Sequence, residues 1–464
     1  MPQDTFDVVV IGAGTGGYSS ALRASQLGLS TALVERDERL GGTCLLRGCI
    51  PTKALLQSAD VLDHINRSDE WGIKASGEPD WSAIQGFKAK VVDKLVSGVA
   101  GLVKARKIES IRGTATLAGS GSVKVQGDDG KERTLTAKNV VLATGSYPKL
   151  LPGLEISERI ITSDEALELD RIPASVVVIG AGAVGLEFAS LYRSFGADVT
   201  VVEALPALAP LEDPDISKEV ARAMRKRGIA AHAGAKVSGV KEGGKGVKVS
   251  FEAGGKNETV EAELCLVAVG RGPISDSAGL DKAGVELERG YVKVDGRLRT
   301  SVDGVWAVGD VAATPFQLAH VSFAEGIAVA ERTAGQDVPE IDYAGIPRVT
   351  YSSPEIASVG LTEPQATERG HDVVIEKLNM QGIGKANIVG EGGMVKVVAE
   401  KDGPVLGVHM VGPHVTDLIS EGMLITNWEA MPAEVAALIH PHPSLSEAVG
   451  EAHLALAGKA LHTP

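Results

Sequence analysis

Two glycine-rich turns, each lying between an apolar run and a helix-like stretch, constrain this sequence more than any other feature. In each copy an acidic residue follows 23 positions after the first glycine, at the end of the next strand-like run. One such turn is weak evidence, but two copies with equal spacing predict an α/β protein with two Rossmann-like dinucleotide-binding domains. The glycines are Gly12, Gly14 and Gly17 in the first turn and Gly180, Gly182 and Gly185 in the second.

Each residue type in these turns has a physical reason. The first glycine makes the tight turn, the second lets the backbone approach a pyrophosphate, and the third lets the helix pack closely on the strand. The acids, Glu35 and Glu203, are expected to accept hydrogen bonds from an adenosine ribose, and the alternative is a solvated acid at a strand end. At Glu203 the carboxylate favours NAD over NADP, because it repels a 2′-phosphate. Two such sites predict electron transfer between two cofactors.

Length, charge and hydropathy exclude several classes of protein. The 464 residues allow about three domains. The net charge of -14 and the absence of a long basic run argue against nucleic acid as a partner. No run approaches the roughly 18 apolar residues of a spanning helix, and the first residues lack the features of a signal peptide. We therefore expect a cytoplasmic protein that does not enter a membrane.

The cysteine pair Cys44 and Cys49 has two interpretations, a redox pair or two ordinary buried thiols. A zinc site would need further cysteine or histidine ligands at matching spacing, and the sequence offers none. Pro51 suits a first helical turn and places Cys49 near a helix start, where the helix and a cation such as Arg47 stabilise a thiolate. Lys53, four residues after Cys49, is expected on the same helix face.

Two further segments contain side chains that could be reactive. Cys265 lies in an apolar strand pattern and is interpreted as a small buried hydrophobic residue. Near the C-terminus, His442 is followed by Ser444 and Glu447. Glu447 is explained equally well as the third residue of a capping box that starts at Ser444, and His442 as a surface loop residue. A histidine there could also act as a general base, since imidazole titrates near neutral pH.

Taken together, these segments resemble the flavoprotein disulfide reductases with two dinucleotide-binding domains, and among them the dihydrolipoamide dehydrogenase family. The resemblance covers essentially the whole chain. Its most specific parts are the Cys-x4-Cys segment and the C-terminal histidine motif. The residues that carry it are 10–14, 41–53, 143–145, the second glycine-rich turn, 308–310, 318–320, 354–360 and 442–447.

The resemblance implies FAD at the first turn and NAD at the second. It implies that Cys44 and Cys49 form a redox disulfide, with Cys44 exchanging with the substrate dithiol and Cys49 next to the flavin. It further implies that Lys53 pairs with Glu187 near the flavin and that Asp310 binds the ribityl chain. From the residues alone, Glu187 is a helical surface acid and Asp310 a loop acid at a strand end. Thr144, Gly145 and Gly270 complete the implied cofactor contacts.

The implied function is oxidation of dihydrolipoyl groups to lipoyl disulfide with NAD as acceptor. His442 would be the general base, oriented by Glu447 and supplied by the partner subunit of a homodimer. The family docks on the lipoyl-bearing transacylase cores of 2-oxo-acid dehydrogenase complexes, which implies that partner here. The implied domains are FAD-binding (1–146 and 273–344), NAD-binding (147–272) and a C-terminal α+β dimer interface (345–464).

Several departures and alternatives accompany the resemblance. Leu46 and Arg47 stand where the family usually has Asn-Val, and Arg47 adds positive charge near the disulfide. Glutathione reductases would want an arginine in place of Glu203. Thioredoxin and mercuric reductases have a C-terminal cysteine pair that this sequence lacks, and the soluble transhydrogenases lack one of the two cysteines present here. The alternative functions are a related reductase with another disulfide substrate or a mainly structural docking subunit.

Overall fold

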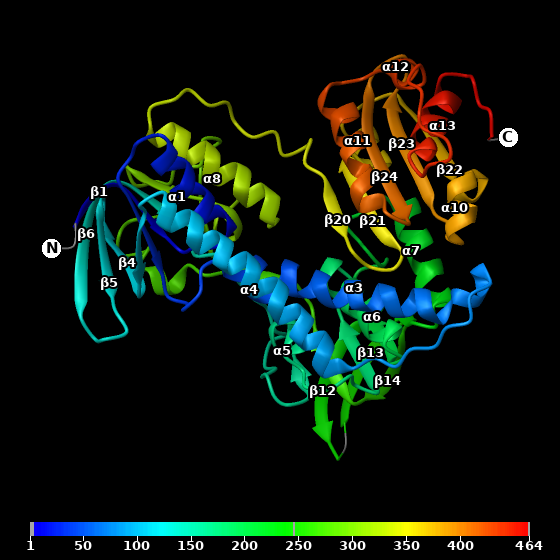
Figure 1. The fold of residues 1–464 in the computed structure, drawn as a ribbon, viewed down its shortest axis with the longest axis horizontal. Coiled ribbons are helices and arrows are strands. Elements are labelled where there is room, and N and C mark those ends of the chain that lie inside the picture. Colours follow the sequence, from blue (N-terminus) through cyan, green and yellow to red (C-terminus); the bar gives the residue numbers. More distant parts are fainter. Residues whose placement is uncertain (1–3, 245, 463–464) are drawn as a thin grey trace. The chain divides into compact units, whose positions relative to one another are not determined.

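The computed structural model describes residues 4–244 and 246–462, which fall into two compact units (Figure 1). Helices α3 (Cys49–Asn66) and α4 (Trp81–Ala105) each have residues in both units. Residues 55–84, which we expected in the first domain, group with the second unit, and the finer division into domains stays a prediction. The first unit contains Met1–Ala54, Gln85–Lys149 and Arg271–Tyr343, and the second contains Leu55–Ile84, Leu150–Gly270 and Ala344–Pro464.

A seven-stranded sheet forms the centre of the first unit. Its parallel strands have the order β3-β2-β1-β6, with β19 also on β6, and β5 and β4 continue it antiparallel. The apolar run predicted as the first strand is almost fully buried, as expected for a parallel strand covered on both faces. The strands are β1 (Thr5–Ile11), β2 (Thr31–Glu35), β3 (Glu109–Arg112), β4 (Thr114–Gly119), β5 (Ser122–Gln126), β6 (Glu132–Leu142) and β19 (Val305–Ala307).

Helix α1 (Thr15–Gln26) begins directly after the first glycine-rich turn and packs against α8 (Ala319–Thr333) (Figure 1). The two helices approach so closely that a side chain at Gly326 would overlap the Gly16 carbonyl and the Ser19 hydroxyl. Glycine at this position permits the close contact. Small residues at this contact therefore fix the direction of α1 and of the turn before it. The remaining elements of the unit are α2 (Gly42–Arg47), the 3-10 helices η2 (Asp276–Ala278) and η3 (Gly309–Val311), and the short pairs β7 (Ser146–Pro148) with β16 (Arg271–Pro273) and β17 (Leu287–Glu288) with β18 (Tyr291–Val292).

A five-stranded parallel sheet of order β11-β10-β9-β15-β8 repeats the strand-turn-helix plan in the second unit. Cys265 lies in β15 with no exposed surface, in agreement with its interpretation as a small hydrophobic residue. The elements are β8 (Ile160–Ile161), α5 (Ser163–Leu167), β9 (Ser175–Ile179), α6 (Ala183–Ser194), β10 (Asp198–Val202), α7 (Pro214–Lys226), β11 (Ala230–His232) and β15 (Leu264–Val267).

Residues 243–255 are rich in glycine and lysine, from which the sequence predicts a hairpin turn region. The structure shows instead that they contain a complete strand, β13 (Gly246–Ala253). It pairs antiparallel with β12 (Lys236–Gly243) and β14 (Lys256–Ala262). The glycines that suggested one turn flank the strand at both ends, and alternate residues of β13, such as Val247, Val249 and Phe251, are buried.

The C-terminal part of the second unit contains an antiparallel sheet of order β20-β21-β24-β23-β22, in agreement with the predicted α+β class. Helix α11 (Val415–Asn427) packs on β21 and β24 (Figure 1). The other elements are β20 (Arg348–Thr350), β21 (Glu355–Gly360), α9 (Glu363–Glu368), β22 (Val373–Asn379), α10 (Gly384–Val389), β23 (Met394–Glu400), β24 (Val405–Gly412), α12 (Pro432–Val435) and α13 (Glu447–Leu456).

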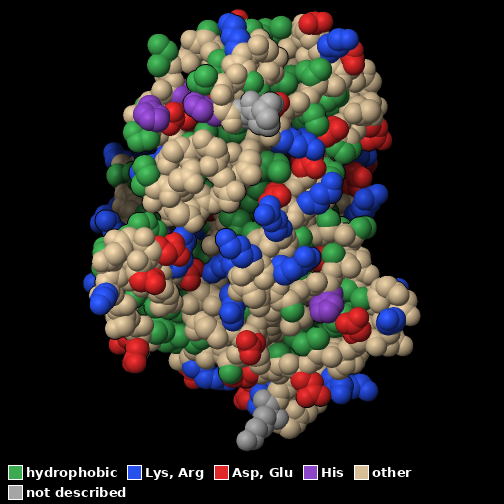
Figure 2. All heavy atoms as spheres, turned by 90° about the vertical axis from the view of Figure 1, so that its right-hand side faces the viewer, with side chains coloured by type: hydrophobic (Ala, Val, Ile, Leu, Met, Phe, Trp, Pro, Cys, Tyr) green, Lys and Arg blue, Asp and Glu red, His purple; other side chains and the backbone are tan. Residues whose placement is uncertain are grey.

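Charge is distributed unevenly over the second unit. The exposed residues in the last three turns of α7 include Lys218, Arg222, Arg225 and Lys226, although the whole chain is acidic. Figure 2 shows lysine and arginine side chains gathered in the middle of one face.

Among the helices of the described residues, none is both long and apolar enough to cross a bilayer.

A buried ionic cluster connects the parallel and antiparallel sheets of the second unit. The Nζ of Lys396, on β23, lies 2.8 Å from Asp213, 2.7 Å from Asp215 and 2.6 Å from Glu363. Burial lowers the pKa of Lys396, but the three carboxylates outweigh burial and raise it to about 12. Asp213, also buried, caps α7 through the N–H of Asp215 and accepts the N–H of Glu363. The cluster therefore fixes the start of α7 against the C-terminal sheet.

Replacing Lys396 by methionine is expected to lower the free energy of unfolding by about 3–5 kcal/mol, because the substitution leaves the fully buried carboxylate of Asp213 without a counter-charge. Urea denaturation measures the change. Lys377→Met is the matched control, since Lys377 is half-exposed and contacts only Asp215 in the same cluster, at 2.8 Å. The control is expected to cost less than about 1 kcal/mol. Equal losses in the two variants would contradict this assignment of the cluster.

Candidate active site

The first glycine-rich turn has the geometry that its spacing predicts. Gly12 has a φ of +99°, and a side chain there would overlap the Ala143 carbonyl. A side chain at Gly17 would overlap the Gly12 carbonyl, which is the close packing required of the third glycine. Gly14 differs, because the nearest atom to its potential Cβ is 3.9 Å away. Only the middle glycine has room beside it, where a ligand would approach.

The second turn repeats this geometry in the other unit. Gly180 has a φ of +106°, and a side chain at Gly185 would overlap the Gly180 carbonyl. Gly182 caps α6 without a side-chain hydrogen bond, and nothing lies within 4 Å of its potential Cβ. The N–H groups at the start of α6 therefore lack a side-chain acceptor of the usual capping kind, and space lies in front of them. This arrangement fits the pyrophosphate of a dinucleotide.

The two strand-end acids bind the turns directly. Glu35 accepts the Ala13 N–H at 2.6 Å, and Glu203 accepts the Ala181 N–H at 2.6 Å. The second oxygen of each acid accepts the N–H two residues further along, from Asp37 in the first case. Both carboxylates are mostly buried, so the alternative of a solvated strand-end acid does not apply. A carboxylate has about four acceptor sites, so capacity for ribose hydroxyls is left at both acids.

The cysteine pair lies beside the first turn in the first unit. Cys44 is in α2, and Cys49 is the first residue of α3, as expected from Pro51 in the first turn of that helix. Both are free thiols, and their side chains form a hydrogen bond with each other. This bond raises the pKa of the Cys44 thiol, and burial raises it further, whereas the positive charge of Lys53 lowers it. Adjacent sulfurs next to a cation support the redox interpretation.

Two further residues lie close enough to affect Cys44 electrostatically. Asp310 raises the pKa of the Cys44 thiol. Burial of Tyr18, together with the smaller effect of the charge of Cys44, raises the pKa of Tyr18 to about 12. Tyr18 follows the third glycine in α1, and its ring packs edge-on against Phe323 with centroids 5.6 Å apart. Sequence reasoning missed Tyr18. Its position immediately after the turn was the available signal, because the start of α1 lies beside the cysteine helices.

Asp310 belongs to a hydrogen-bonded cluster of polar residues. Its Oδ2 accepts the Ser146 hydroxyl at 2.5 Å, and Arg271 donates to the same hydroxyl at 2.7 Å. Arg271 was not expected here. Thr144, predicted as a cofactor contact, donates its hydroxyl to the Ile274 carbonyl at 2.5 Å. Gly145, with a φ of +78°, has open space beside it. The cluster fixes Asp310 near the cysteines, and its predicted contact with a ribityl chain stays a prediction.

The structure gives Arg47 a partner that the sequence did not indicate. Its guanidinium forms an ion pair with Asp37, in the loop that follows β2. Among the groups that shift the pKa of Cys44, the cation is Lys53. The expected effect of Arg47 on a thiolate at Cys49 stays a prediction.

Glu187, predicted from the residues alone as a surface acid, is buried in α6. Its Oε1 accepts the Tyr351 N–H at 3.0 Å. Lys53 belongs to the first unit and Glu187 to the second, so their predicted pairing stays a prediction. Gly270, the last residue of the Leu150–Gly270 segment, has a φ of +106° and open space beside it.

The C-terminal histidine motif is held by one carboxylate. The Oε1 of Glu447 lies 2.8 Å from Nδ1 of His442, and its Oε2 accepts the Ser444 N–H at 2.8 Å. Burial raises the pKa of Glu447, but the Ser444 N–H and His442 outweigh burial and lower it. The predicted capping box is only half formed, because α13 begins at Glu447 after Ser446. Glu447 therefore orients the imidazole ring of His442, and the His442 side chain is 76% exposed.

Large apolar side chains are exposed on the same C-terminal part. Trp428 is 74% exposed, Leu438 64% and Ile439 98%. They lie in the chain between the end of α11 and the His442 segment, within the residues of the C-terminal domain.

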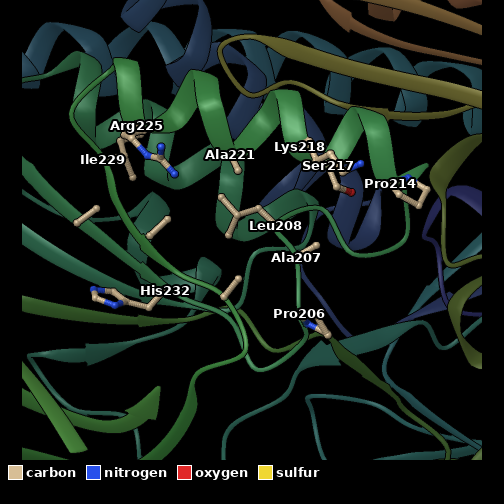
Figure 3. A pocket seen from close by; sticks show the side chains of 13 residues that line it. Pro206, Ala207, Leu208, Pro214, Ser217, Lys218, Ala221, Arg225, Ile229 and His232 are labelled. Atoms are coloured by element: carbon tan, nitrogen blue, oxygen red, sulfur yellow. The ribbon is translucent and has the colours of Figure 1, made fainter. Parts of the chain in front are cut away.

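A groove of about 620 Å³ runs along α7 and β11 in the second unit (Figure 3). Small apolar residues such as Ala207, Ala221 and Ala231 line it, together with Lys218 and Arg225. The lining includes neither the glycines of the second turn nor Glu203. The groove is therefore lined by residues other than those predicted to bind NAD.

Comparison with known proteins agrees with this geometry. Residues 6–326 match the family model described as pyridine nucleotide-disulphide oxidoreductase, and residues 346–453 match its dimerisation domain. The chain belongs to this family. Its cofactors are FAD and NAD, and the open middle glycines with their ordered acids fit two dinucleotides. The dimerisation domain supports the predicted homodimer.

Relatives and solved structures cover nearly the whole chain. The chain is 44% identical to a dihydrolipoyl dehydrogenase of Bacillus subtilis, over 98% of this chain and 99% of that one. A dihydrolipoyl dehydrogenase of Rhizobium etli is 42% identical, over 99% of both chains. The crystal structure of LpdA from Mycobacterium tuberculosis superposes with a TM-score of 0.89 at 26% identity, covering 97% of this chain and 99% of that chain. The fold class and the family predicted from the sequence are thus confirmed.

The second turn permits a prediction that separates folding from binding. Gly185→Ala is expected to cost about 1–3 kcal/mol of stability, because its Cβ overlaps the Gly180 carbonyl. Gly182→Ala is expected to leave the free energy of unfolding within about 0.5 kcal/mol, yet to raise KM for NAD by about tenfold to hundredfold. Urea denaturation and steady-state kinetics measure the two effects. Unchanged KM in Gly182→Ala would exclude this turn from the NAD site.

Proposed function

We propose that the chain is a dihydrolipoyl dehydrogenase, which oxidises a dihydrolipoyl dithiol to the cyclic disulfide and reduces NAD. The observation that carries the proposal is the direct contact between the Cys44 and Cys49 thiols beside the first dinucleotide turn. The names of full-length relatives with similar sequences support the same substrate. The alternative of a purely structural subunit would not need this contact or the oriented His442.

Cys44 and Cys49 exchange two electrons with the substrate. A dihydrolipoyl thiolate attacks Cys44 of the oxidised pair, the bond between the two cysteine sulfurs breaks, and Cys49 leaves as a thiolate. The second substrate thiol then attacks the mixed disulfide, closes the lipoyl ring and releases Cys44. The substrate loses two electrons and two protons; the cysteine pair gains the two electrons, one proton ends on the released Cys44 and the other on the partner subunit's His442. FAD held at Gly12–Gly17 would supply the electron-accepting and hydride-transfer chemistry that links the cysteine pair to NAD.

Proton removal is assigned to the partner subunit's His442. Its Nδ1 is held by Glu447, which leaves Nε2 to take the proton from the substrate thiol. The exposure of the ring on a single chain and the exposed apolar residues nearby support an active site completed by dimerisation. Lys53 is assigned to the flavin side of the cysteine pair, with Glu187 as its partner.

We further propose that the dimer docks on a lipoyl-bearing transacylase core of a 2-oxo-acid dehydrogenase complex, where the lipoyl groups are presented. We propose a cytoplasmic location, because a close cysteine pair in a reducing compartment is more often catalytic than structural.

Anaerobic rapid mixing of the purified protein with dihydrolipoamide, followed by NAD, tests the proposal. Bleaching of the flavin absorbance and appearance of NADH on adding NAD are the expected results. Cys44→Ser is expected to lose this turnover while keeping FAD. A flavin that stays oxidised with dihydrolipoamide but is reduced by NADH would indicate a different disulfide substrate and overturn the proposal.

His442→Ala is expected to slow the half-reaction with dihydrolipoamide by about 10²- to 10⁴-fold, the range of general-base catalysis. Reduction of the enzyme by NADH is expected to change far less, because no substrate thiol is involved. His462→Ala is the matched control, since His462 is also exposed and lies 3.0 Å from a carboxylate, that of Glu451. Equal losses in both half-reactions of His442→Ala would contradict the assigned role.

A further inference from the structure

Helix α2, which carries Cys44, is attached at its start to the first dinucleotide turn and at its end to the loop that follows β2. At its start, the Gly41 N–H donates to the Ala13 carbonyl at 2.9 Å, and Gly42, with a φ of +59°, approaches Gly14 so closely that a side chain would overlap it. At its end, Arg47 forms the ion pair with Asp37. The Arg47–Asp37 pair therefore connects the end of α2 to the loop that precedes this helix.

Asp37 is in turn connected to the predicted ribose acid. Its N–H donates to Oε1 of Glu35 at 2.9 Å, while Oε2 of the same carboxylate holds the Ala13 N–H. A continuous series of contacts thus runs from the glycine-rich turn through Glu35 and Asp37 to Arg47. Arg47 lies three residues after Cys44 and two before Cys49.

The small free energy expected of this ion pair indicates that its main role is not to stabilise the fold. The side chains of Arg47 and Asp37 are 37% and 30% exposed. Partly exposed ion pairs contribute about 0–1 kcal/mol to folding, which is small for a chain of this size. The same small energy is sufficient to choose between two positions of a six-residue helix whose sulfur must meet a substrate within a few tenths of an ångström.

We propose that Arg47 and Asp37 are positioning residues that couple the adenosine end of the FAD site to the position of Cys44. Ribose hydroxyls bound at Glu35 order its carboxylate, the carboxylate orders the Asp37 backbone, and Asp37 holds the end of α2 through Arg47. The inference rests on the proposed role of Glu35 at the ribose. It does not depend on which disulfide is the substrate.

Two measurements on the holoenzyme test the coupling, and neither uses turnover. The first is the rate of FAD release, followed by the gain in flavin fluorescence on dilution into mild urea. The second is the rate at which iodoacetamide alkylates Cys44 after reduction of the pair. Arg47→Gln is expected to raise both rates by about twofold to fivefold, the range that a partly exposed ion pair supplies. Arg47→Lys is expected to restore both rates.

Asp37→Asn is expected to reproduce Arg47→Gln, and the double variant to show no further change, because both substitutions break the same contact. Arg39→Gln is the matched control. Arg39 lies in the same loop, but its ion pair is with Asp93 on α4, 2.5 Å away, and not with the loop or α2. It is expected to leave both rates unchanged.

Three results would overturn the proposal: equal effects of Arg39→Gln and Arg47→Gln, additive effects in the double variant, or faster FAD release with an unchanged alkylation rate. The last result would confine the pair to the cofactor loop. Dihydrolipoamide oxidation by the wild-type enzyme is measured in parallel. Its absence would contradict the proposed function while leaving the coupling result intact.

Discussion

The contact of a buried carboxylate with the backbone of a glycine-rich turn is the interaction on which both dinucleotide sites depend. Glu35 and Glu203 each hold the N–H of the residue after the first glycine at 2.6 Å. The third glycine of each turn is pressed against the carbonyl of the first, so neither turn can relax around a larger side chain. Turn, strand end and helix start are thereby fixed together, which leaves only the middle glycine open toward a ligand.

The organisation of the molecule follows from this constraint being present twice. Helix α1 is aimed by its close contact with α8, and the first turn in turn sets the start of the cysteine-bearing helix through Gly41 and Gly42. In the second unit, the Lys396 cluster fixes the start of α7 against the C-terminal sheet, and helix α13, which begins at Glu447 of the histidine motif, packs on β22 and β23 of that sheet. The predicted reactive residues therefore lie at or near the ends of helices whose positions are fixed by these contacts, as Cys49 does at the start of α3 and Glu447 at the start of α13.

Features set by local spacing were predictable from the sequence. The two turns, their acids, the start of α3 at Cys49 and the antiparallel C-terminal sheet need only neighbouring residues, period and turn chemistry. Contacts between distant residues could not be read in this way. The ion pair of Arg47 with Asp37, the burial of Glu187 under Tyr351 and the Arg271–Ser146–Asp310 cluster each join segments whose proximity the fold decides. The strand inside residues 243–255 was missed because its flanking glycines were read as one turn.

The exposure of His442 has a consequence for mixed assemblies. On the proposed mechanism each reaction centre combines cysteines from one subunit with an imidazole from the other. A subunit lacking Cys44 and a subunit lacking His442 would therefore be inactive as pure dimers but would form, when mixed, a heterodimer with one complete centre. Genetic complementation between two differently defective copies of the same gene therefore follows from the architecture.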